Sequence, residues 1–288
     1  MNLFWSHTVW YLLLGIASLA QLIYTLYHSE NRRQTFAFYF SLVALPLYFE
    51  TVVMIFLNAY VYDPDIIRDP KLNPFNDALA GNLFSQFGVA SSAVLLIIRR
   101  KPFYWYAIVA FIYSMVEVLF VHLDIYRHHW WKTWMTFIGL LLYFAISKWL
   151  HVQFIRGVRP LYFKGYILLG MFPICTIPCI WGILDLSGSM RCSTTLIPHH
   201  PRLSQYGLNF IFTSVAFPIT IWGYYQRHWA WRIVSVAAIG ALIYAGYISH
   251  LMVFREGSLV PIGILMIIWM YGSVWFLDML YRGRPQEQ

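Results

Sequence analysis

The sequence predicts an all-α protein, a polytopic transmembrane helix bundle, and three observations support this class. Of the 288 residues, 60% are hydrophobic and only 11% are charged, whereas soluble domains carry about 25% charged residues. Apolar runs long enough to cross ~30 Å of hydrocarbon recur from end to end. Short connectors with basic residues separate these runs. We therefore expect a single integral-membrane domain over residues 1–288, multi-pass in the cell membrane.

The apolar runs define about nine expected spans. No Lys or Arg precedes the first run, so it lacks the charged start of a cleaved signal peptide and should remain as a span. Pro46, inside the second run, leaves the carbonyl group of Leu42 without its helical partner, close to Glu50. The spans are expected at residues 8–27, 36–60, 79–98, 103–124, 133–150, 161–185, 206–225, 230–254 and 258–281.

The distribution of Lys and Arg predicts the orientation in the membrane. The connectors after odd-numbered spans, the span ends beside them and the C-terminal tail together hold 13 of the 20 basic residues. Cytoplasmic connectors are the ones enriched in Lys and Arg. We therefore expect the N-terminus outside and the C-terminus in the cytoplasm. The net charge of +8 comes from these connectors, so it does not indicate a nucleic-acid partner.

The three cysteines predict neither a disulfide framework nor a paired CxxC metal site. Cys175 and Cys179 lie in one apolar run, where the intervening proline disturbs their spacing, so a soft-metal site is disfavoured. We interpret the cysteines as free thiols and expect no cofactor.

The most unusual stretch is residues 114–132, SMVEVLFVHLDIYRHHWWK. Glu117 lies inside an apolar run, where a carboxylate costs ~2.5 to 3.5 kcal/mol on insertion scales. Such a group usually faces a bundle interior or a wet cavity. At helical spacing Ser114, Glu117 and Asp124 share one stripe, and His128 extends it if the helix continues that far.

Glu50 is a second acid inside an apolar run, and three polar residues of the next run share a helical face at i, i+3, i+4 spacing. Consecutive spans pack as neighbours, so we expect these groups to meet in the outer half of the membrane. The predicted binding cavity contains Glu50, Asn82, Ser85, Gln86, Ser114, Glu117 and Asp124. The alternative is a packing kink at Pro46, with Glu50 hydrogen-bonded to its neighbours.

Residues 36–150 resemble a group of uncharacterised multi-pass membrane proteins from Bacillus-like endospore-forming bacteria. The resemblance is carried by Glu50, the group from Asn82 to Gln86, Glu117 and, most specifically, the run YRHHWWKTW. The resemblance implies a multi-pass membrane fold and an endospore-forming bacterial host, and it implies no particular activity. The tryptophans of the run, Trp130, Trp131 and Trp134, predict an interfacial belt, with an aromatic cage for a cation as the alternative.

Buried carboxylates exchange charge with ligands, so the favoured function is binding or translocation of a small cation, proton or polar head group. The expected partners are the lipid bilayer and this small ligand or ion. The first alternative is a membrane-embedded metal-dependent hydrolase or lipid-modifying enzyme, although no HExxH or other complete ligand motif is present. Its zinc ligands would come from His122, Asp124, His128, His129, His200 and His250. The second alternative is a sensory or structural membrane subunit.

Overall fold

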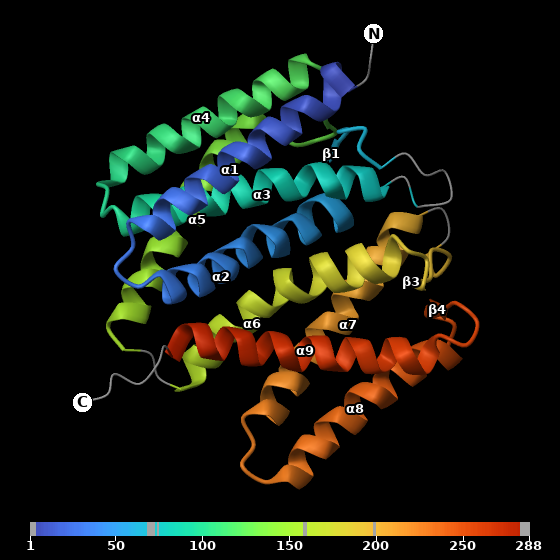
Figure 1. Ribbon diagram of the computed structural model, residues 1–288. Helices are drawn as coiled ribbons and strands as arrows, with labels where there is room; N and C mark the ends of the chain where they lie inside the picture. Colours follow the sequence, from blue (N-terminus) through green and yellow to red (C-terminus); the bar gives the residue numbers. More distant parts are fainter. Residues whose placement is uncertain (1–3, 68–72, 74, 158–159, 198–199, 283–288) are drawn as a thin grey trace. The chain divides into compact units, whose positions relative to one another are not determined.

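A computed structural model describes residues 4–67, 73, 75–157, 160–197 and 200–282, and these residues form nine α-helices (Figure 1). The helices are α1 (Val9–Tyr27), α2 (Arg32–Glu50), α3 (Phe75–Ile98), α4 (Phe103–His122), α5 (Thr133–Ile155), α6 (Pro160–Cys175), α7 (Pro201–Tyr224), α8 (Trp229–Ile248) and α9 (Leu259–Arg282). Wider π-helical turns precede α1 (η1, Phe4–Thr8), extend α2 (η2, Thr51–Phe56) and extend α6 (η3, Thr176–Asp185). The predicted all-α transmembrane architecture is confirmed.

Eight of these helices, with their π-helical extensions, are long and apolar enough to cross a membrane. Their outward faces carry large apolar side chains, as in α1, where Ile16, Leu19 and Ile23 are more than half exposed. Such continuous apolar surface is stable against lipid and unfavourable against water. The exception is α7, which buries polar side chains that lower its mean hydropathy, among them Gln205 and Thr213.

Two expected helix ends differ from the structure because short strands follow the helices. The span expected at 36–60 ends at Phe56, and Tyr60–Tyr62 form strand β1. The span expected at 103–124 ends at His122, and Tyr126–His128 form strand β2, which pairs antiparallel with β1. Asp124 has a left-handed backbone with φ 56°, a conformation that ends a right-handed helix. His128 therefore lies on a strand, so the condition under which it would extend the helical stripe is not met.

The second half of the chain contains the same feature. The span expected at 230–254 ends at Ile248, and strand β4 (Met252–Phe254) pairs antiparallel with β3 (Met190–Cys192). His250 has the same φ of 56° that Asp124 has. A two-stranded ribbon therefore follows both α4 and α8.

The chain divides into two compact units, Met1–Arg159 and Pro160–Gln288. The first has the order α2, η2, β1, α3, α4, β2, α5, and the second has α6, η3, β3, α7, α8, β4, α9. From α3 onward each element begins 126 residues later in the second unit, so that 75, 103, 126 and 133 become 201, 229, 252 and 259. Two units with one topology and one set of spacings are the pattern that duplication of a segment produces. Helix α1 is an addition to the first unit and packs along α3.

Candidate functional site

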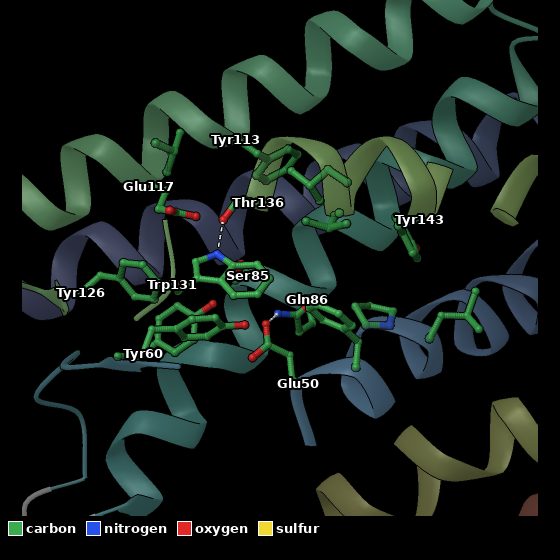
Figure 2. Close-up of a pocket in the computed structure, with 18 of the residues that line it drawn as sticks. Glu50, Tyr60, Ser85, Gln86, Tyr113, Glu117, Tyr126, Trp131, Thr136 and Tyr143 are labelled. Carbon is green, nitrogen blue, oxygen red and sulfur yellow. Dashed lines mark hydrogen bonds between the residues drawn. The ribbon is translucent and has the colours of Figure 1, made fainter. Parts of the chain in front are cut away.

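The first unit encloses a cavity of about 360 Å³ to which all five of its helices contribute (Figure 2). Two acids and a group of aromatic rings supply much of its polar lining, and none of the described residues that line it is Lys or Arg. The lining polar or aromatic residues are Phe49, Glu50, Tyr60, Tyr62, Ser85, Gln86, Tyr113, Glu117, Phe120, Tyr126, Trp131, Thr136 and Tyr143. A site of this composition carries net negative charge when its acids are ionised.

Glu50 lies where α2 ends and the π-helical turns of η2 begin. Its Oε1 accepts a hydrogen bond of 2.9 Å from Nε2 of Gln86, and the same Nε2 donates to Oδ1 of Asn82 over 2.7 Å. Glu50 is only 6% exposed, and its Oε2 has no hydrogen-bond partner among the described residues. A buried carboxyl group must be protonated or balanced by a cation. The hydroxyl of Tyr60 also lies within hydrogen-bonding reach of this carboxyl group, and no described cation is paired with it, so Glu50 is the acid of the cavity that needs a proton or a cation.

Pro46 sets the local geometry that precedes Glu50. As the sequence indicates, the missing amide hydrogen leaves the carbonyl group of Leu42 without its helical donor. The hydroxyl of Tyr143, on α5, donates to this carbonyl oxygen over 3.2 Å. Both Pro46 and Tyr143 line the cavity. The carbonyl group freed by the proline thus lets Tyr143 tie α2 to α5 at the cavity wall.

Glu117 faces the same cavity from α4 and has a partner that the sequence did not reveal. Its Oε1 lies 2.9 Å from Nε2 of His128 on strand β2. The two side chains are 10% and 19% exposed. Glu117 is therefore paired with His128, which strand β2 positions next to the end of α4.

Aromatic side chains from the ribbon and its flanking loop line one part of the cavity. The ring of Tyr60 lies 5.3 Å from that of Tyr126 and 5.5 Å from that of Trp131, between centroids. Burial raises the pKa of Tyr60 well above its ordinary value, and the charge of the neighbouring Glu50 adds to the rise. Burial raises the pKa of Tyr126 in the same way. Both phenols therefore keep their protons across the physiological pH range.

The run HHWW, residues 128–131, caps the end of η2. The backbone amides of His129, Trp130 and Trp131 all point to the carbonyl oxygen of Ala59, at 2.8 to 3.3 Å. The indole of Trp130 donates to the carbonyl oxygen of Leu57 over 2.9 Å. Leu57 and Ala59 lie in the turn between η2 and β1, so this run satisfies carbonyl groups of that turn and fixes its position.

This cap separates the predicted roles of the tryptophans. Trp130 and Trp134 are 44% and 60% exposed, as an interfacial belt requires. Trp131 is 8% exposed, lines the cavity and donates from its indole nitrogen to Thr136 over 2.7 Å (Figure 2). The exposure of Trp130 and Trp134 fits the predicted belt, and Trp131 lies inside the cavity instead.

Of the seven residues predicted to form the cavity, four line it, one contacts a lining residue and two lie elsewhere. Glu50, Ser85, Gln86 and Glu117 line it, and Asn82 contacts it through Gln86. Ser114 is buried, and its hydroxyl donates to the carbonyl group of Ala110 in its own helix. Asp124 is exposed in the turn before β2. Neither Ser114 nor Asp124 is a lining residue.

The histidines considered as zinc ligands do not gather into a site in the part of the chain that is described, where no group of three or more His, Cys, Asp or Glu could hold a metal ion. His128 is held by Glu117, and Nδ1 of His129 lies 2.8 Å from the carbonyl oxygen of Asn58. His122 and His200 are exposed, as is His250. The geometry gives no support to the metal-dependent alternative.

The second unit provides an internal comparison for the cavity. The shift of 126 residues places apolar side chains at the counterparts of Gln86, Tyr113, Glu117, Tyr126 and Thr136. These counterparts are Phe212, Ile239, Ile243, Met252 and Ile262, and each is at most 8% exposed. The counterpart of His128 is Phe254. The same helical frame thus forms with apolar groups at these positions, so the polar side chains at these positions are not a requirement of the fold.

Comparison with known proteins gives no relative: no family model, no curated protein and no solved structure matches the chain. The fold and the site define a multi-pass membrane protein with an acidic, aromatic-lined cavity in its first unit.

Proposed function

We propose that the protein binds or translocates a small cation, a proton or a polar head group, and that the cavity of the first unit is the site. The observation that carries the proposal is Glu50, a carboxyl group that is 6% exposed and has one oxygen without a partner among the described residues. An intramembrane acid of this kind is costly unless a ligand or proton neutralises it. The apolar counterparts of Gln86 and Glu117 in the second unit indicate that the fold alone does not require these two polar groups.

The proposal includes an orientation. With the N-terminus outside, α2 and α4 both end on the outer side, so the ribbon that follows them and the adjoining cavity belong to the outer half of the membrane. A ligand would then reach Glu50 from outside the cell, past the aromatic wall.

The experiment is a stability screen of the purified protein in lipid nanodiscs. The apparent unfolding temperature is measured with sodium, potassium or choline chloride, and at pH values from 5 to 8. At least one of these cations, or the proton, should raise the unfolding temperature of the wild type, because a ligand that binds only the folded state stabilises it. Glu50→Gln should abolish this response.

Two further variants make the result specific. Glu256→Gln removes an exposed acid of the second unit and should leave the response intact. Gly139 lines the cavity, and a Cβ added there meets no atom within 4 Å, so Gly139→Leu should fill the space and weaken binding without touching a carboxylate. A wild type that responds to none of these ions, or a response that survives Glu50→Gln, contradicts the proposal.

A further inference from the structure

We propose that the ligand is an organic cation with an alkylated ammonium group, such as choline or a choline-type head group, rather than a bare inorganic cation. This inference rests on the proposed function and narrows its ligand class. The relevant observation is that Glu50 and the rings of Tyr60, Tyr126 and Trp131 line one cavity (Figure 2).

The aromatic wall is the first argument. Tyr60 lies between Tyr126 and Trp131, with ring centroids at 5.3 and 5.5 Å, and all three side chains are at most 8% exposed. A cation within ~6 Å of an aromatic ring centroid is attracted by the ring, and desolvation strengthens the attraction. Aromatic cages of this kind recognise quaternary ammonium groups.

The size of the cavity is the second argument. A volume of about 360 Å³ falls in the range of ~300 to 1,000 Å³ that is usual for small-molecule sites. A bare calcium or magnesium ion needs six or more oxygen ligands at ~2.0 to 2.6 Å, and the largely aromatic and aliphatic lining does not offer such a shell. A methylated ammonium group needs no oxygen shell and fills more of the space.

The charge of the lining is the third argument, and it excludes an anion. None of the described lining residues is Lys or Arg, and both acidic groups are carboxyls. Glu117 is already paired with His128 at 2.9 Å. Glu50 therefore supplies the countercharge, and the aromatic rings surround the alkyl groups.

The test is calorimetric titration of the full-length protein in nanodiscs of phosphatidylglycerol, a lipid that has no ammonium group. The probes are choline and its neutral isostere 3,3-dimethylbutan-1-ol, in which carbon replaces the charged nitrogen. Choline should bind at least about tenfold more tightly than the isostere, because only the charged form gains from the rings and from Glu50. Glu50→Gln should remove this preference.

The aromatic wall is tested with a matched pair of tryptophans. Trp131→Leu should weaken choline binding about tenfold. Trp134→Leu, in the same run but 60% exposed and outside the cavity, should have no effect. Tyr60→Phe keeps the ring and should weaken binding less than Tyr60→Leu does. Unfolding temperatures identify any variant that fails to fold. Among folded variants, a smaller loss of choline affinity in Tyr60→Phe than in Tyr60→Leu supports the aromatic wall, and an equal loss contradicts it.

The ammonium group could belong to a free metabolite or to a lipid. In micelles with equal phosphatidylcholine and phosphatidylglycerol, native mass spectrometry should show selective retention of phosphatidylcholine if the source is a lipid. Titration with free choline should show binding if it is a soluble molecule. If neither the lipid nor free choline binds, or if choline and its isostere bind with equal affinity, the inference is overturned. If sodium, potassium or protons still act through Glu50, the proposed function stands and only the inference about the ammonium group fails. If no ligand binds, the inference and the proposed function both fail.

Discussion

Nε2 of His128 lies 2.9 Å from Oε1 of Glu117, and this contact joins strand β2 to helix α4. It places the ribbon over the cavity that Glu117 lines. The corresponding residues of the second unit are Phe254 and Ile243, so the same junction there is apolar.

The contact predicts strong coupling between the two residues. Glu117→Ile alone leaves His128 without its partner and should cost ~1 to 3 kcal/mol of stability. The double variant Glu117→Ile, His128→Phe reproduces the junction of the second unit and should cost less, because replacing both partners by apolar groups is often close to neutral. Apparent unfolding temperatures of the single and double variants measure this. Effects that simply add would show that the pair is not coupled.

The hydrogen bond from Tyr143 to the carbonyl oxygen of Leu42 predicts a second coupling. Tyr143→Phe leaves this buried carbonyl without a donor and should cost ~1 to 3 kcal/mol. Pro46→Ala returns an amide hydrogen to the helix, which can donate to the same oxygen. Tyr143→Phe should therefore cost less in the Pro46→Ala background. An equal cost in both backgrounds, measured by unfolding temperature, would mean that the proline does not create the need for Tyr143.

The orientation is tested with a reporter fused after Gln288. The distribution of Lys and Arg predicts a cytoplasmic C-terminus, so a reporter that is active only in the cytoplasm should be active there. A fusion after Ser29, in the connector between α1 and α2, should behave alike because the two positions are expected on one side. A reporter that works only outside the cell after Gln288 would show that the number of spans differs by one. Arg159 and Arg284, which contribute to the basic count, lie outside the described residues.

The sequence predicted the helices well because the length and apolar character of a span are set by the membrane itself. The expected span at 161–185 matches α6 and η3 closely. The grouping of Glu50 with Gln86 was also visible, since buried polar groups on neighbouring spans pair with each other.

The ribbons were not predictable by periodicity, because strands of three residues such as β2 are too short to show alternation. As a result the contact between Glu117 and a strand residue was missed: His128 was grouped with Glu117 only on the condition that the helix continued. Tyr60, Tyr126 and Tyr143 were also missed, since tyrosines near a membrane surface are ordinary. The repeat was hidden because the halves share few identical residues at equivalent positions, among them Gly81 with Gly207 and Trp105 with Trp231. Its signal is the constant spacing of the helices.

The central claim is that the cavity is open to ligands from outside the cell. The most direct measurement is the reaction of Gly139→Cys with a membrane-impermeant, positively charged thiol reagent added to the outer side. The background is low, because Cys175, Cys179 and Cys192 are buried. Gly240→Cys is the control, since an added Cβ there also meets no atom within 4 Å but the residue does not line the cavity.

We expect the Gly139→Cys variant to react rapidly from outside and the Gly240→Cys variant to remain unmodified. We also expect that a cation bound at Glu50 slows the reaction at position 139. Reaction of Gly139→Cys only with lipid-soluble reagents, or only from the cytoplasmic side, would contradict the account.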